Sequence, residues 1–412
     1  MRVVEINAVC GSGSTGRICT DIADALKESG DQVKIIYGNQ NSTYPESVRV
    51  GSQISLKANA LFARISGLNG YFALRETKKI IKIIKDFSPD IVHLHNLHAN
   101  YVNVPKLLNF LSENNIATVV TLHDCWFFTG KCTHYISSGC KKWENGCGEC
   151  PRLKQDIPSL FFDRTEKMWL DKKNGFEKLK NLGVIGVSDW ITNEAKKSFL
   201  KNAKIIKRIY NWIDLEIFNT KPQNNVNKNE KFTVFVASAG WENGSERFND
   251  LLKLAKKIPD NMQIVAAGNF EDSATLPSNI AKVGYISDSK IMANYYRNSD
   301  VYVHLSRADT FGKVIAEALA CGTPAVVYNS TACPEIVGDG CGYVVNCGDI
   351  NSILKYCLEI QKNGKEFYSE KCRLFAKSRF DKKVLTEQAL DLYKELLKEL
   401  LCGENIKCFG IY

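Results

Sequence analysis

Short apolar runs alternate with longer amphipathic segments along most of the chain. In the first half, the runs that predict strands are VVEINAV (3–9), QVKIIYG (32–38), DIVHLHN (90–96), ATVVTLHD (117–124) and GVIGVSD (183–189). The intervals between them leave room for helices, which is typical of βαβ units around a parallel sheet. The last three runs end in polar residues. We expect these ends at the carboxyl edge of the sheet, where open α/β domains bind ligands.

A second alternation follows the polar segment 221–231, which we interpret as an interdomain linker. Strands are predicted over 231–238, 262–268, 300–306 and 324–329, with helices over 248–258, 289–298, 313–321 and 382–401. The pattern predicts an α/β protein with two doubly wound Rossmann-like domains. We expect the first over 1–215 and the second over 216–385. A C-terminal helix in 386–412 would pack back across the junction.

Composition narrows the class of protein. A chain of 412 residues with 44% hydrophobic and 24% charged residues is typical of a soluble globular protein with two or three domains. No run of about 18 apolar residues occurs, and the apolar N-terminal segment is too short for a signal peptide. We therefore expect a cytoplasmic protein. Its formal charge of +9 is spread out and accompanies no nucleic-acid-binding motif, so we expect no nucleic acid partner.

The first predicted strand runs into CGSGSTGR (10–17), which holds a G-x-G-x-x-G at Gly11, Gly13 and Gly16. Glycines here permit a tight strand-to-helix turn and let backbone amides approach an anion. A dinucleotide site would also need an acidic residue about 20 positions later. The second strand instead runs into Asn39 and Gln40. NAD and FAD are therefore disfavoured, and a purely structural turn stays open.

The most informative stretch is SRADTFGKVIAEALACGTPAVVYNSTACPEIV (306–337). A strand ends near Ser306, a loop holds Asp309, and a helix beginning near Lys313 carries Glu317. Amides at a helix N-terminus suit sugar oxygens or a diphosphate. The two carboxylate oxygens of Glu317 suit a ribose diol.

This stretch resembles the E-x7-E signature of the retaining nucleotide-sugar transferases of glycosyltransferase family 4. That family has the GT-B fold, in which two Rossmann-like domains face each other across a cleft. The resemblance covers nearly the whole chain. It includes the Gly-rich loop, GVSDW (186–190), YNWID (210–214), ALACGTP (318–324) and PEIV (334–337).

The resemblance implies a role for each matching residue. Asp309 would lie near the transferred sugar and Glu317 on the ribose. The donor would meet the amides of Phe311, Gly312 and Lys313. In the first domain, Gly13 would face the donor phosphates and His123 would lie close to the donor sugar; strand-end position alone leaves the role of His95 open.

The chain departs from the family pattern at three places. The first acid is Asp309 rather than Glu, Arg247 alone remains of the usual basic pair, and Ala332 and Cys333 replace Gly-Gly. For single residues the alternative is a solvated side chain. For the whole chain the alternatives are a non-catalytic sugar-nucleotide-binding module and a GT-B sugar-nucleotide epimerase.

The function implied by the resemblance is transfer of a hexose from a nucleotide-diphosphate donor to a glycan or lipid-linked acceptor. The anomeric configuration would be retained. Capsular, exopolysaccharide or lipopolysaccharide synthesis is the expected context, and no cofactor is expected for catalysis. The basic stretch Leu56–Lys85 is a candidate for peripheral contact with the inner face of the cell membrane. Alternatively, it only covers the sheet.

Between two strands of the first domain lies a cysteine-rich insertion, 125–151. Its C-x7-C-x6-C-x2-C spacing is formed by Cys132, Cys140, Cys147 and Cys150. Four thiolates could close a structural zinc site, and the alternatives are a set of buried thiols or an oxidation-sensitive loop. The insertion also carries the aromatic residues Trp126, Phe127, Phe128 and Trp143. These predict either a sugar-stacking acceptor platform or a small local core.

Overall fold

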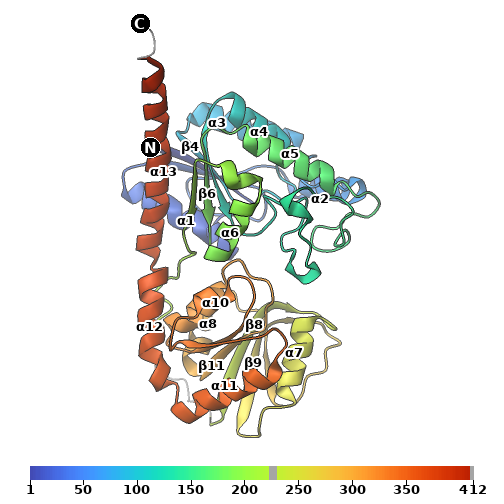
Figure 1. The fold of residues 1–412 in the computed structure, drawn as a ribbon, viewed down its shortest axis with the longest axis vertical. Coiled ribbons are helices and arrows are strands. Elements are labelled where there is room, and N and C mark those ends of the chain that lie inside the picture. The colour runs from blue at the N-terminus through green and yellow to red at the C-terminus, as the bar shows by residue number, and fades with distance from the viewer. Residues whose placement is uncertain (222–229, 409–412) are drawn as a thin grey trace. The chain divides into compact units, whose positions relative to one another are not determined.

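The computed structural model describes residues 1–221 and 230–408 (Figure 1). Contacts divide the chain into two compact units. One comprises Met1–Ile209 together with the chain from Leu385 onward, and the other comprises Tyr210–Val384. The boundary falls between Ile209 and Tyr210. Most of the predicted linker, 221–231, lies outside the described residues.

The first unit is built on a seven-stranded parallel sheet with the order β3-β2-β1-β4-β5-β6-β7. Its strands are β1 (Arg2–Asn7), β2 (Gln32–Tyr37), β3 (Ser47–Arg49), β4 (Ile91–Leu94), β5 (Ala117–Leu122), β6 (Leu182–Gly186) and β7 (Ile205–Arg208). Its helices are α1 (Gly13–Glu28), α2 (Gln53–Ser66), α3 (Leu74–Phe87), α4 (Val104–Glu113), α5 (Thr165–Glu177) and α6 (Asp189–Lys197). The central strands β4 and β5 are fully buried, which explains their continuous apolar runs.

The second unit has a six-stranded parallel sheet with the order β10-β9-β8-β11-β12-β13. Its strands are β8 (Phe232–Trp241), β9 (Met262–Phe270), β10 (Ile280–Val283), β11 (Val301–His304), β12 (Ala325–Tyr328) and β13 (Gly342–Val345). Its helices are α7 (Glu246–Ala255), α8 (Ser289–Asn298), α9 (Lys313–Ala320), α10 (Cys333–Ile336), α11 (Ile350–Asn363) and α12 (Glu366–Phe380). Two doubly wound parallel sheets confirm the predicted fold class.

The last helix, α13 (Lys382–Cys408), begins in the second unit and belongs to the first from Leu385 onward. Leu392, Tyr393 and Leu396 are fully buried there. The Tyr393 hydroxyl lies 2.7 Å from Nδ1 of His93 on β4. Among the described residues, no helix combines the length and the apolar character that a membrane span requires.

Candidate active site

The predicted acid pair lies at the carboxyl edge of the second sheet. Strand β11 ends at His304, the following loop holds Asp309, and α9 begins after Gly312 and carries Glu317. Gly312 is the N-cap of α9 and has φ +79°, a conformation that side-chain-bearing residues rarely adopt. The strand–loop–helix arrangement expected from the sequence is therefore present.

Asp309 is held by a chain of buried hydrogen bonds. Its Oδ2 lies 2.7 Å from Nε2 of His304, whose Nδ1 lies 3.0 Å from the hydroxyl of Tyr302. Burial raises the pKa of Tyr302 well above its usual value, so this hydroxyl stays protonated and donates to the ring. The opposite nitrogen of His304 then donates to Asp309. His304 was missed by the sequence analysis, although its strand-end position five residues before Asp309 is a usable signal.

The segment that replaces the family's Gly-Gly supports the same loop. The Thr331 hydroxyl accepts from the amide of Asp309 at 3.0 Å, and the Asp309 carbonyl accepts from the amide of Ala332 at 3.2 Å. The Cys333 sulfur lies within 4.8 Å of ligand atoms of His304 and Asp309. Burial raises the pKa of the Cys333 thiol, which disfavours the thiolate that a metal would need.

Glu317 is oriented from a neighbouring helix. The Tyr296 hydroxyl on α8 donates to Oε2 of Glu317 at 3.3 Å, and burial raises the pKa of Tyr296 well above its usual value. The Glu317 side chain keeps part of its surface exposed. A fixed, partly exposed carboxylate one to two turns into a helix is suited to accept hydrogen bonds from a diol.

Of the remaining residues predicted to bind the donor, Phe311 holds the loop in place and Lys313 is accessible to a ligand. The Phe311 ring is buried and packs on Tyr210 and Phe380, with ring centroids 5.9 and 5.4 Å apart. It therefore anchors the loop, and only its backbone can meet a ligand. Lys313 begins α9 with its side chain partly exposed.

Arg247, the residue predicted to bind diphosphate, lies at the start of α7. Its Nη1 donates to the hydroxyl of Ser238, and no carboxylate in the described ranges lies within ion-pair distance of it. Arg307, by contrast, pairs with Glu246 and with Asp250 at 2.6 Å. Of these two guanidinium groups, only Arg247 keeps its charge uncommitted to a carboxylate and able to bind an anion.

In the first unit, Gly13 begins α1 with φ +62°. A Cβ at Gly13 would meet nothing within 4 Å, so the backbone conformation, and not crowding, requires glycine there. Gly16 differs, because its Cβ would lie 3.1 Å from the amide nitrogen of Gly11. The glycine-rich turn thus packs tightly at Gly16, and the space beside Gly13 at the first turn of α1 stays open.

His123 follows β5 directly and contacts a second histidine. Its Nε2 lies 2.9 Å from Nδ1 of His95, and the two rings are stacked. Burial lowers the pKa of His123 to about 4 and that of His93 to about 3. It also lowers the pKa of His95 well below its usual value. All three imidazoles are therefore neutral near pH 7.

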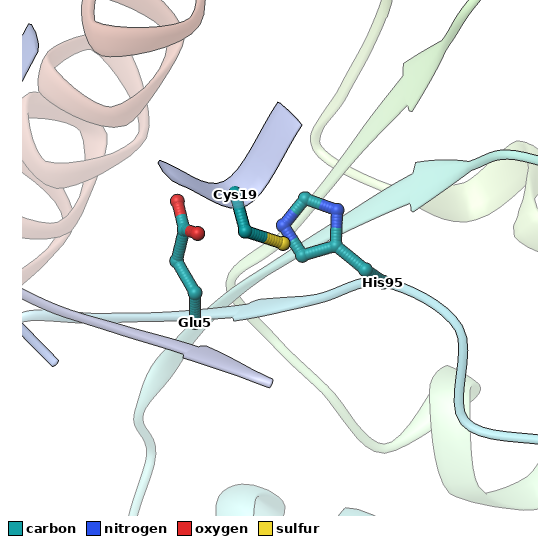
Figure 2. A group of neighbouring side chains, drawn as sticks. All are labelled: Glu5, Cys19 and His95. Atoms are coloured by element: carbon teal, nitrogen blue, oxygen red, sulfur yellow. The ribbon is translucent and has the colours of Figure 1, made fainter. Parts of the chain in front are cut away.

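His95 also belongs to a buried polar group with Glu5 and Cys19 (Figure 2). The candidate ligand atoms of these three side chains lie within 4.8 Å of one another. Figure 2 shows the Cys19 sulfur directed toward the His95 ring. Burial raises the pKa of both the Glu5 carboxyl and the Cys19 thiol well above their usual values. The group is therefore uncharged, and we interpret it as a neutral polar layer beneath the histidine pair.

In the cysteine-rich insertion, all four predicted metal-ligating thiols border one pocket. The four aromatic rings Trp126, Phe127, Phe128 and Trp143 are at most 2% exposed. Phe128 and Trp143 pack with ring centroids 4.9 Å apart. These rings form a small local core and offer no accessible platform for stacking a sugar.

Comparison with known proteins connects these sites to a family. Residues 15–217 match the family model Glycosyltransferase Family 4, and residues 216–379 match Glycosyl transferases group 1. The protein assigned as the colanic acid biosynthesis glycosyl transferase WcaC of Escherichia coli (strain K12) is 21% identical over 363 residues, which cover 84% of this chain and 87% of that protein. The N,N'-diacetylbacillosaminyl-diphospho-undecaprenol alpha-1,3-N-acetylgalactosaminyltransferase of Campylobacter jejuni is 22% identical over 406 residues, covering 92% and 95%.

Solved structures share the fold along almost the whole chain. A sucrose-phosphate synthase from Thermosynechococcus elongatus superimposes with a TM-score of 0.71 at 15% identity, covering 97% of this chain and 100% of that one. Anabaena HepE in complex with UDP and glucose superimposes with a TM-score of 0.63 at 15% identity, covering 96% and 100%. At these identities the likeness shows a common GT-B fold.

Proposed function

The chain belongs to the glycosyltransferases of family 4, and on that premise we propose that it moves a sugar from a nucleotide-diphosphate donor to a hydroxyl of a glycan or lipid-linked acceptor, with retained anomeric configuration. The observation that carries this proposal is the arrangement around α9. His304 contacts Asp309, Tyr296 contacts Glu317, and the N-terminus of α9, which has no side-chain cap, comes between the two acids in the sequence.

The second unit supplies groups for each part of such a donor. Glu317 accepts hydrogen bonds from the ribose diol, and the amides that begin α9 bind diphosphate or sugar oxygens. Arg247 neutralises the diphosphate as its charge grows, because its guanidinium has no carboxylate partner in the described ranges. Asp309 orients the transferred sugar.

The proposed transfer breaks the bond between the anomeric carbon and the leaving phosphate oxygen, and that oxygen keeps the electron pair. The acceptor hydroxyl oxygen forms the new bond to the anomeric carbon, and its proton goes to the departing diphosphate. Preorganised amides and Arg247 stabilise the negative charge that develops on the leaving group. The proposal assigns this role to the protein's own groups and not to a divalent ion.

We assign the reaction to the synthesis of a cell-surface polysaccharide. The named relatives support this context, since one is assigned to colanic acid biosynthesis and another acts on a diphospho-undecaprenol-linked sugar. A lipid-linked acceptor of that kind would be met at a membrane surface, and the first unit carries a surface suited to such contact.

That surface overlaps the predicted stretch Leu56–Lys85 at Leu61 and Phe62 and extends beyond it. In the basic run of α3, Ile80 and Ile84 are fully buried and the lysines are exposed. Exposed apolar side chains gather instead on α2 and on the loop 160–162, which contact each other through the Leu160 amide and the Arg64 carbonyl at 2.8 Å. We name as the α2 patch the exposed residues Ile54, Leu61, Phe62, Leu160, Phe161 and Phe162.

The test is a transfer assay with the purified full chain, a panel of nucleotide sugars and undecaprenyl-diphosphate-linked acceptors. A retaining transferase gives a glycoside with the donor's anomeric configuration, which NMR coupling constants report. Asp309→Asn should lower turnover more than donor affinity, because the carboxylate acts mainly in the transition state. Asp272→Asn, at an exposed acid of the same unit, is the matched control.

Three results would contradict the proposal or one of its residue roles. Epimerised nucleotide sugar formed from donor alone would indicate an epimerase, and an inverted product would exclude retention. Full turnover by Asp309→Asn would remove that residue from the reaction.

A further inference from the structure

The insertion between β5 and α5 holds its shape with almost no regular structure. The described elements within 125–151 are two short 3-10 helices, Ile136–Ser138 and Lys142–Glu144. A loop this long inside a compact unit is uncommon, and when it is ordered it usually has a function or is held by a cross-link. The buried rings of Phe128, Tyr135 and Trp143 supply only a small core, with centroids 4.9 and 5.2 Å from Trp143.

The thiols of the insertion gather at one place. Residues from three separate parts of the loop border a single pocket, and they include Cys132, Cys140, Cys147 and Cys150. The structure records all four as unbridged and partly exposed, unlike the buried Cys125. Cys132 and Cys150 already share a side-chain hydrogen bond.

A backbone amide is directed at one of these sulfurs. The amide of Gly130 donates to the Cys147 sulfur at 3.1 Å. Hydrogen bonds of this kind orient and stabilise metal-ligating side chains. They are worth more to a thiolate than to a neutral thiol, because charge strengthens the acceptor.

Two buried lysines, Lys131 and Lys172, lie near the thiols. Nζ of Lys131 donates to the carbonyls of Gln155 and Ile157, each at 2.8 Å, and Nζ of Lys172 donates to the Trp126 carbonyl at 2.5 Å. Both side chains are at most 4% exposed. In the part of the chain that the structure describes, neither has a carboxylate within ion-pair distance. Backbone carbonyl oxygens therefore hold both amines.

We propose that this pocket binds one structural Zn²⁺ through its four sulfurs, Cys132, Cys140, Cys147 and Cys150. Four thiolates around one Zn²⁺ carry a net charge of about −2. Four sulfur ligands leave no open coordination position, so the metal orders the insertion and takes no part in the transfer.

Binding requires a small closure of the pocket. Tetrahedral zinc with Zn–S bonds of about 2.3 Å sets its sulfurs roughly 3.8 Å apart. In the described ranges, two groups of three side chains have candidate ligand atoms within 4.8 Å of one another: Glu5 with Cys19 and His95, and His304 with Asp309 and Cys333. The four sulfurs of the insertion are in neither group, so they lie farther apart than zinc requires. The four sulfurs must therefore move closer together when the metal binds.

The test is metal analysis of the full chain purified without chelator from zinc-supplemented cells. We expect about one zinc per chain, and Co²⁺ exchanged into the same site should show the ligand-field bands of tetrahedral thiolate coordination. Cys147→Ser and Cys140→Ser should each lose most of the metal and lower the melting temperature. Cys125→Ala removes a thiol of the same insertion that does not border the pocket, and it should retain the metal.

The metal content and cobalt spectrum of the parent protein test the proposal even if the serine variants fail to fold. A folded, metal-free parent whose melting temperature does not respond to zinc or chelator would overturn it. A Cys132–Cys150 disulfide found by mass spectrometry under reducing purification would also overturn it, as would equal zinc retention by Cys125→Ala and Cys147→Ser.

Discussion

The imidazoles of His95 and His123 share a hydrogen bond, with 2.9 Å between Nδ1 of His95 and Nε2 of His123. One ring must donate and the other accept, so the contact exists only while at least one of them is neutral. Burial is the largest cause of the lowered pKa of both rings. His123 is therefore presented to any ligand as a neutral imidazole with a defined orientation.

The histidine cluster makes the stability of the protein sensitive to mild acid. In the unfolded chain His93, His95 and His123 return to a pKa of about 6.5, so it binds more protons than the folded protein as the pH falls below that value. Glu5 has the opposite effect on stability. Its raised pKa keeps one proton on the folded protein that the unfolded chain has released. Near pH 5 the net excess is about two protons, which lowers the free energy of unfolding by about 2.7 kcal/mol per pH unit. Urea unfolding between pH 7 and pH 5 measures this slope.

Glu5→Gln provides the internal control for that prediction. The variant keeps the shape of the side chain and removes the opposing proton. We expect its stability to fall more steeply between pH 7 and pH 5, by about 1.4 kcal/mol per pH unit more than the parent. Ordinary carboxyls are ionised in both states over most of this range. A flat profile in the parent would show that the three histidines are not buried as neutral rings.

Glu317→Gln tests the ribose assignment. The change keeps the size of the side chain and its contact with Tyr296 but removes the charge, so hydrogen bonds to a diol should weaken by about 1.5–3 kcal/mol. Nucleotide affinity should then fall about ten- to a hundredfold, as measured by calorimetry with nucleoside diphosphates. Glu271→Gln, at an exposed position of the same unit, should bind like the parent. Unchanged binding by Glu317→Gln would make this carboxylate an ordinary helix residue.

Arg247→Ala tests the diphosphate assignment. The guanidinium donates to Ser238, and we place its proposed ligand at a phosphate. The variant should therefore lose affinity for a nucleoside diphosphate by about tenfold or more and keep its affinity for the free nucleoside, because charge-assisted hydrogen bonds are lost only in the first case. Lys253→Ala removes an exposed cation from the same helix and is the control. Equal losses of affinity for both ligands would mean that Arg247 supports the fold of the second unit and does not bind phosphate.

The α2 patch predicts where the protein contacts an anionic membrane. Replacing Phe62 and Phe161 by Ser should reduce binding to phosphatidylglycerol vesicles about tenfold or more, because burying each ring stabilises the bound state by about 1.5–3 kcal/mol. Salt should weaken binding of the parent by screening the neighbouring Lys57 and Arg64. Phe367→Ser changes a ring in the second unit that is 60% exposed. Sedimentation that gives equal losses for the control, or none for the double variant, would contradict this assignment.

The hydrophobic pattern predicted the central strands well because burial on both faces of a parallel sheet leaves a continuous apolar run. In the described ranges the pattern missed β3, β7, β10 and β13, the short strands at the edges of the two sheets. Ser47–Arg49 and Ile280–Val283 contain polar residues and owe their extended form to pairing with β2 and β9. Such edge strands are created by tertiary contact and leave little trace in the sequence.

At the candidate site, motif spacing predicted the strand–loop–helix geometry of Asp309 and Glu317 but none of the groups that hold them. His304 and Tyr296 reach these acids through side-chain rotamers and neighbouring elements, which spacing does not encode. The aromatic run near Trp126 was ambiguous for a different reason. A buried ring and a sugar-stacking ring have the same residue type, and only burial distinguishes them.

The helix α13 has a consequence for the order in which the protein is made. Tyr393 completes a hydrogen bond with His93, a residue 300 positions earlier, and Leu392 packs beside Gly183. The ribosome therefore releases every strand of the first sheet long before the side chains that cover part of it. A nascent or truncated chain that ends before Leu385 carries an incomplete first core, a typical cause of aggregation and proteolysis. The first unit is thus completed only once α13 has been synthesised.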